Sequence, residues 1–214
     1  MPARLAVMAQ GFDTIKEALS IVGSLGRPSK MPGFAYGIPA RRCPIGAVLA
    51  KIPNSVCSDC YALKGRYVFE NVQKAQERRF KSLRHPRWAE AMAWLINRYH
   101  CEWFRWHDSG DLQGFWHLEL LCEVARRCPN TQFWLPTRER ATVRYFKGTI
   151  PSNLLVRMSG TMIDGPAPKE FPHTSRVVTK LEDATCPAYK QGGKCGDCRA
   201  CWSPDTPNVN YPQH

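Results

Sequence analysis

Four cysteines are crowded into a short stretch near the C-terminal end of the sequence: Cys186, Cys195, Cys198 and Cys201. The last three form a C-x2-C-x2-C run, the spacing with which ferredoxin-type proteins hold three corners of an iron–sulfur cubane. Cys186 is the candidate for the fourth corner. Structural zinc instead favours two C-x2-C pairs a dozen or more residues apart. This C-terminal cysteine set therefore favours a [4Fe–4S] cluster, with zinc as the alternative.

An N-terminal cysteine set has three members, Cys43, Cys57 and Cys60. Three thiolates on a cubane leave one iron open to a ligand from outside the protein. Radical S-adenosylmethionine enzymes are similar in this respect, because their open iron takes the amine and carboxylate of the cofactor. Their usual spacing is C-x3-C-x2-C, whereas the first gap here is thirteen residues. The alternatives are zinc with a fourth ligand and a structural cluster shared with another cysteine.

The remaining cysteines, Cys101, Cys122 and Cys128, have no ligand-like spacing. Cys122 falls on the apolar face of a helix predicted over 115–127, so we expect a small core residue there. His117, in the same helix, is expected to be packed or exposed rather than a ligand.

The composition limits the class of protein and its compartment. The chain has 214 residues, of which 43% are hydrophobic, enough for one domain with an accessory segment. The N-terminus has no apolar run of the kind a signal peptide needs, and no stretch reaches the roughly 18 apolar residues of a transmembrane helix. We therefore expect a soluble, cytoplasmic protein without a membrane partner. Its ten cysteines should then be thiols or metal ligands rather than disulfides.

The charge balance favours an anionic partner. The formal net charge is +12, and the stretch 64–87 alone contains eight Lys or Arg against two Glu. A basic helix of this kind is typical of contacts with the phosphates of DNA or RNA. A merely solvated helix face is the alternative interpretation.

Hydrophobic periodicity predicts an alternation of strands and helices. Helical patterns cover 12–22, 67–83, 88–98, 115–127 and 138–147, and strand-like runs cover 34–38, 102–107, 131–137, 153–158 and 175–180. Strands alternating with helices indicate βαβ units and a parallel sheet. The expected fold is an α/β partial (βα) barrel or open parallel sheet, resembling a truncated radical-SAM core. We divide the chain into an N-terminal helix and loop (1–33), a βα domain (34–180) and a Cys-rich metal-binding tail packed on it (181–214).

The carboxyl ends of the predicted strands carry polar residues, where parallel sheets place their functional sites. His107, Asp108 and Asp111 follow the strand at 102–107 and are the candidate catalytic residues. Ser109, Gly110 and Asp111 stand where radical-SAM enzymes carry a turn that contacts the cofactor amine, so they are the candidate cofactor-binding residues.

The next two strand ends add further polar groups. Arg138 with Glu139, and Arg157 with Ser159, are expected to face the same cavity. An arginine there suits a carboxylate or phosphate, which it can bind through two parallel hydrogen bonds.

Several stretches together resemble a known family: GRPSKMPG, SVCSDCYALKGRY, FRWHDSGDLQ, FWLPTRE and CGDCRACW. They are similar to the phage-encoded gene product 88 proteins, over most of the chain from about residue 24 onward. The resemblance implies a viral protein of the host bacterial cytoplasm whose cysteines carry metal. It implies no particular reaction.

Two functional hypotheses follow. The first is a radical-SAM-like enzyme acting on nucleic acid or a nucleotide, with one or two [4Fe–4S] clusters and S-adenosylmethionine as cofactors. The second is a non-catalytic iron–sulfur or zinc protein that binds nucleic acid or a host factor, its cluster being structural or redox-sensing.

Overall fold

The chain folds around one parallel sheet whose strands follow one another in sequence order. The computed structural model describes residues 11–213, and its six-stranded sheet has the order β1-β2-β3-β4-β5-β6 with every neighbouring pair parallel. The strands are β1 (Phe34–Tyr36), β2 (Trp103–Trp106), β3 (Gln132–Thr137), β4 (Leu154–Ile163), β5 (Thr174–Val178) and β6 (Asn208–Pro212). The prediction of an open parallel α/β sheet is confirmed, and the sixth strand was not predicted.

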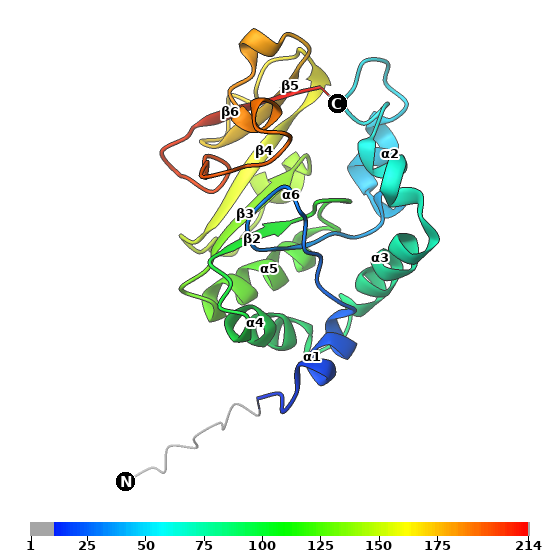
Figure 1. Ribbon diagram of the computed structural model, residues 1–214, viewed down its shortest axis with the longest axis vertical. Coiled ribbons are helices and arrows are strands. Elements are labelled where there is room, and N and C mark those ends of the chain that lie inside the picture. Colours follow the sequence, from blue (N-terminus) through cyan, green and yellow to red (C-terminus); the bar gives the residue numbers. More distant parts are fainter. Residues whose placement is uncertain (1–10, 214) are drawn as a thin grey trace.

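Helices connect the strands (Figure 1). They are α1 (Ile15–Val22), α2 (Pro44–Leu49), α3 (Glu70–Ser82), α4 (Trp88–Arg98), α5 (Phe115–Arg127) and α6 (Arg140–Arg144). Two of them, α4 and α5, have the predicted bounds, and α2 was not predicted. Within residues 11–213, no helix combines the length and apolar character needed to cross a bilayer. Of the N-terminal segment predicted at 1–33, residues 1–10 lie outside the described part.

One face of the sheet is covered by α1, α4 and α5, and the main core lies between them. Aromatic side chains of β2 and β3 fill this core, with Trp106 stacked on Phe133 at a centroid distance of 5.8 Å. Tyr36 of β1 holds the helices in place, because its hydroxyl donates to the carbonyl of Val22 (2.6 Å) and accepts from Nε1 of Trp88 (3.2 Å). The buried apolar area of these rings is the main source of stability.

The opposite face of the sheet is concave. The ring of Trp134 on β3 stacks on that of Tyr211 on β6 at 6.4 Å, although three strand spacings on a flat sheet would separate them by about 14 Å. The sheet therefore curls, as in an incomplete barrel. Trp202, from the segment between β5 and β6, fills the hollow: it packs on Trp134 at 5.2 Å and donates from Nε1 to the carbonyl of Phe104 (3.0 Å).

The segment predicted as a tail at 181–214 is thus continuous with the main sheet. Its cysteine-rich part covers the concave face, and its last strand, β6, pairs with β5 from Thr174↔Asn208 to Val178↔Pro212. In Figure 1 the cysteine-rich part of this segment (orange to red) lies beside β4, β5 and β6.

Candidate functional site

The N-terminal cysteine set lies in the long connection between β1 and α3, above the carboxyl ends of the strands. Cys43 caps α2, with its Sγ accepting from the backbone N–H of Gly46 at 3.2 Å. Cys57 is buried and Cys60 half-buried. The thiols are close enough for their charges to interact in the pairs Cys43–Cys57 and Cys57–Cys60. Cys57 therefore lies within electrostatic range of both other cysteines, although the three span eighteen positions of the sequence.

Hydrogen bonds fasten this connection to three different strand ends. Before the first cysteine, the carbonyl of Arg42 accepts from Nε2 of Gln113, which follows β2, at 2.9 Å. After it, the N–H of Ile45 donates to Oε1 of Glu139, which follows β3, at 3.0 Å. Further along, the N–H of Val56 donates to the carbonyl of Thr161 on β4 at 2.8 Å. The thiols are thus held over the carboxyl edge of the sheet by the backbone on either side of them.

Asp111 lies directly beside these thiols. It is 4% exposed, and its charge acts on both Cys43 and Cys57. Its carboxylate accepts three hydrogen bonds: from Oγ1 of Thr137 (2.5 Å), from the N–H of Arg138 (2.8 Å) and from its own neighbour Leu112 (2.7 Å). Asp111 therefore joins the end of β2 to the end of β3 and places a buried negative charge next to the cysteines.

The local electrostatics favour a bound cation. Burial, followed by the charges of Asp111, Cys57 and Glu139, raises the pKa of the Cys43 thiol to about 12, although the hydrogen bond from the Gly46 N–H opposes this rise. Burial also raises the pKa of Asp111 above its usual range. Burial likewise raises the pKa of Cys57, and the charge of Arg138 opposes this rise without cancelling it. Nε of Arg138 donates to the carbonyl of Gly160 at 3.1 Å. Thiols with raised pKa values become thiolates only when positive charge is brought close to them.

The predicted catalytic residues after β2 point in two directions. His107 has a left-handed backbone (φ 53°) and its ring meets that of His117 on α5 at 5.1 Å, so it lies on the helix-covered side. Asp108 lies on the side of the cysteine loop, where its carbonyl accepts from the hydroxyl of Tyr61 (2.6 Å) and its Oδ2 from that of Tyr67 (3.3 Å). His107 and Asp108 are therefore adjacent in sequence but face different surroundings.

Ser109 and Gly110 form a tight turn against the end of β1. The carbonyl of Ser109 accepts from the N–H of Ile38 at 3.0 Å, while its Oγ is buried without a partner among residues 11–213. Gly110 has φ 79°, and a Cβ there would lie 2.9 Å from the carbonyl oxygen of Ile38. Only glycine fits this close approach without strain.

The C-terminal cysteine set forms its own group in the segment between β5 and β6. The charges of its thiols interact in the pairs Cys186–Cys195, Cys186–Cys198, Cys186–Cys201 and Cys195–Cys198. Sγ of Cys201 lies 3.1 Å from the hydroxyl of Tyr211. All ten cysteines of the chain are free thiols. In the described part of the chain, no three His, Cys, Asp or Glu side chains are already arranged as a metal-ligand shell.

Arg157, predicted to meet an anionic ligand, is fully buried and holds the cysteine-rich segment. Its guanidinium donates to the carbonyls of Thr174 (2.9 Å), Ala200 (3.0 Å) and Thr206 (3.0 Å). Ser159 is also buried, and its Oγ lies 3.1 Å from that of Ser175 on β5. Arg157 and Ser159 therefore lie within β4 and away from the N-terminal cysteine set, whereas the end of β4 contacts the N-terminal loop through Thr161 and Ile163.

The structure adds residues that the sequence did not single out. Arg105 lies on the concave face over the ring of Trp134 at 4.6 Å, and its charge acts on Tyr61, Asp108 and Cys195. Its charge also acts on Cys201, so among the cysteines it acts on members of the C-terminal set. A charged residue inside the otherwise apolar strand 103–106 was the available signal. Cys101, Cys122 and Cys128 are buried in the core, as predicted for Cys122.

The basic stretch 64–87 divides into structural and exposed cations. Arg79 is structural: its Nε donates to the carbonyl of Ser24 (3.2 Å) and its guanidinium lies over the ring of Tyr36. Arg87 pairs with Glu90. Lys64, Arg66, Lys74, Arg78, Lys81 and Arg84 are exposed.

Fold and site together define an open parallel α/β protein, with the N-terminal cysteine set over the carboxyl edge of its sheet and the C-terminal set on its concave face. The family model of gene product 88 matches residues 8–204, so the chain belongs to the gene product 88 family. No curated protein matches the sequence, and no solved structure matches it.

Proposed function

We propose that this phage-type protein is an iron–sulfur enzyme of the bacterial cytoplasm, built on the N-terminal cysteine set. Cys43, Cys57 and Cys60 would hold a [4Fe–4S] cluster by three irons. The fourth iron would be open to a chelating ligand such as S-adenosylmethionine. The observation that carries this proposal is the gathering of three thiols beside the buried Asp111 at the carboxyl edge of a curled parallel sheet.

The chemistry of the donor set fits such a centre. When bound, a cluster with an open iron supplies a Lewis-acidic position and one-electron redox chemistry. The chain itself contributes the environment: Asp111 fixes the ends of β2 and β3 in register, and Glu139 holds the loop after Cys43 through Ile45. Arg138 contributes a positive charge next to Cys57, which favours the thiolate.

The C-terminal set fits a closed, structural centre. Four thiols can satisfy a metal completely, which is the usual arrangement of structural zinc and of fully ligated clusters. Cys186, Cys195, Cys198 and Cys201 belong to a segment whose backbone is held by Arg157 and by the Trp202 anchor. We propose that a second [4Fe–4S] cluster, or zinc, stabilises this segment.

The test is to prepare the protein without air and to count iron, sulfide and zinc while recording the absorption spectrum. We expect broad absorption near 400 nm, as iron–sulfur clusters give. Cys57→Ala should remove one cluster, and Cys198→Ser should remove the other metal and lower the thermal stability, because metal binding and folding of that segment are coupled. Cys122→Ala is the matched control, since Cys122 is a core cysteine, and it should leave both counts unchanged. Stoichiometric zinc without sulfide would contradict the proposal.

The open iron is tested separately by calorimetric titration of S-adenosylmethionine into the anaerobic protein. Spin-resonance spectra of the reduced cluster are recorded with and without the cofactor. Binding together with a shifted spectrum supports the enzyme. If millimolar cofactor neither binds nor moves the spectrum, the second candidate function, a non-catalytic nucleic-acid-binding iron–sulfur protein, is the better description. The exposed cations of 64–87 favour that alternative.

A further inference from the structure

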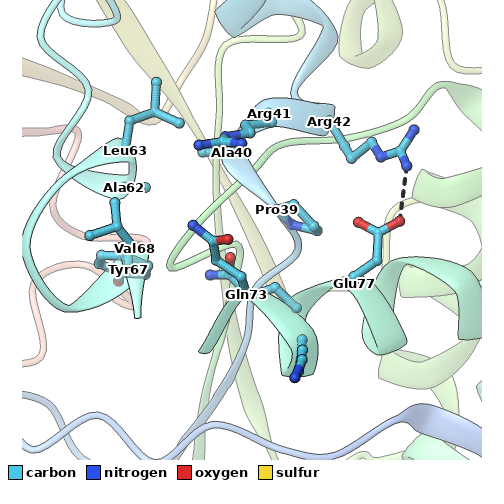
Figure 2. A pocket seen from close by; sticks show the side chains of 12 residues that line it. Pro39, Ala40, Arg41, Arg42, Ala62, Leu63, Tyr67, Val68, Gln73 and Glu77 are labelled. Atoms are coloured by element: carbon cyan, nitrogen blue, oxygen red, sulfur yellow. Dashed lines mark hydrogen bonds and ion pairs between the residues drawn. The ribbon is translucent and has the colours of Figure 1, made fainter. Parts of the chain in front are cut away.

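A pocket of about 500 Å³ lies beside the N-terminal cysteine set, on the outer side of the loop that carries it (Figure 2). Three segments form its walls: residues 39–42 immediately before Cys43, residues 62–68 shortly after Cys60, and one face of α3. Its volume is in the range of pockets that hold a small-molecule ligand. A ligand in this pocket would therefore be bounded by the same loop that holds the three thiols.

The α3 wall carries two amide side chains, Gln73 and Gln76. Gln76 is 4% exposed and lines the pocket, and its side chain has no hydrogen-bond partner among residues 11–213. Gln73, one helical turn earlier, points from α3 toward Arg41 and Val68 in Figure 2. Gln73 is half-buried. An amide both donates and accepts hydrogen bonds, so two amides on one helix face are suited to a ligand that does the same.

The other walls supply apolar surface and positive charge. Leu63 and Val68 remain 44% and 46% exposed, which leaves apolar area for a flat ring to cover. Arg41 is exposed and has no ion-pair or hydrogen-bond partner in the described residues, while Arg42 is oriented by Glu77 at 2.9 Å. An aromatic ring with a pendant anion matches this arrangement of walls.

We propose that this pocket binds an adenine nucleotide. A glutamine amide pairs with adenine through two hydrogen bonds, accepting from N6 and donating to N7, and both Gln73 and Gln76 line this pocket. The ring would lie against Leu63 and Val68. The phosphate would lie at the mouth, where Arg41 and Arg42 can neutralise it.

The pocket is physically connected to the strand-end residues. Tyr67 lines it, and the hydroxyl of Tyr67 reaches the carbonyl and carboxylate of Asp108, both at 3.3 Å. A ligand bound there would touch a side chain that contacts the end of β2. Binding of the nucleotide in this pocket does not rest on the proposed function. Only a further role for the nucleotide, as the substrate of a cluster at the N-terminal cysteine set, would rest on it.

The experiment is calorimetric titration of the full-length protein with adenosine 5′-monophosphate, adenosine, inosine 5′-monophosphate and a short oligodeoxyadenylate. We expect the monophosphate to bind more tightly than adenosine, and inosine monophosphate to bind about tenfold more weakly, because it lacks the amino group at N6. Gln76→Ala should weaken both adenine ligands by roughly five- to tenfold. Arg41→Ala should weaken the monophosphate but leave adenosine unchanged.

The controls keep the outcomes distinct. Gln132→Ala removes an exposed glutamine at the start of β3 and should leave every affinity unchanged. Tighter binding of the oligonucleotide than of the monophosphate identifies a nucleotide within a strand as the ligand, and the reverse identifies the free nucleotide; both support an adenine site. Nucleotide binding with no iron in the preparation would defeat the proposed function but not this site. No binding of any ligand at millimolar concentration, or unchanged affinity in Gln76→Ala, overturns the site.

Discussion

Two buried charged residues hold the segments around the N-terminal and the C-terminal cysteine set. Asp111 and Arg157 are both charged and both buried, and each uses its hydrogen-bonding capacity on the chain itself. Asp111 accepts from two strand ends, and Arg157 donates to carbonyls of a segment more than forty residues away. Buried charges are tolerated only with such partners. Their positions are consequently fixed, and so are those of the cysteines around them.

Arg157→Ala should strongly destabilise the fold. Several buried carbonyls, among them those of Thr174, Ala200 and Thr206, would lose their donor, and we expect a loss of roughly 3 kcal/mol or more in the free energy of unfolding. Urea denaturation of the variant and of Arg98→Ala measures this, the latter being an exposed arginine of α4. Equal midpoints for the two variants would contradict the structural role of Arg157.

Two buried histidines should make the protein sensitive to acid. Burial, followed by the charge of Arg84, lowers the pKa of His117 to about 3, and burial together with His117 and Arg105 lowers the pKa of His107 well below its usual value. An unfolded histidine has a pKa near 6.5. Between about pH 6.5 and 3 the unfolded chain therefore binds more protons than the folded chain, and stability falls as the pH falls.

The measurement is the free energy of unfolding of wild type and His117→Leu from pH 7 to pH 4. Each such histidine contributes a slope of at most about 1.4 kcal/mol per pH unit, and removing His117 should flatten the curve by up to that amount. His100→Asn, at an exposed position with a left-handed backbone that asparagine tolerates, should keep the wild-type slope. Parallel curves for wild type and His117→Leu would show that His117 does not titrate on unfolding.

At the scale of elements, the sequence predicts those helices and strands in which apolar residues recur at a regular spacing. The helices α4 and α5 were predicted with their observed bounds because Trp88, Met92, Leu95 and Leu118, Leu121, Cys122 recur at helical spacing and are buried. The strand β6 was not predicted, because NVNYP mixes asparagines and a proline with two apolar residues. The helix α2 was missed because it is six residues long and lies inside a loop bounded by cysteines.

The candidate site was partly predictable for a physical reason. Carboxyl ends of parallel strands converge at one edge, so the neighbourhood of Asp111 and the loop with Cys43 and Cys57 followed from the order of the elements. The direction of Arg157 did not, because backbone carbonyls that accept its hydrogen bonds leave no trace in the sequence. The left-handed backbone of His107, with φ 53°, is equally invisible there.

At the scale of the whole molecule, the exposed cations after the cysteine loop form a surface that should attract nucleic acid. Arg66, Arg78 and Lys81 are exposed and do not line the pocket. Reversing all three to Glu should abolish binding of a single-stranded oligonucleotide, and wild-type binding should weaken steeply with salt because phosphate contacts release counterions. Fluorescence anisotropy between 50 and about 200 mM salt measures both effects.

The control is the same change of charge elsewhere on the surface: Lys147, Lys169 and Lys180, all exposed, are reversed to Glu. This variant should keep most of the binding. Equal losses in the two triple variants would mean that only the net charge matters and that residues 64–87 are no special surface.

The order of the strands gives the last one a particular importance. β6 pairs only with β5 in the sheet and is reached through the cysteine-rich segment. When that segment loses its shape, β6 is held by its pairing with β5 and by Tyr211 alone. If this pairing opens, the backbone N–H and C=O groups of β5 become an open edge. Such an edge recruits strands of other chains. Damage to the thiols should therefore first be visible as aggregation, before the helix-covered core has melted, and light scattering during mild oxidation would follow it.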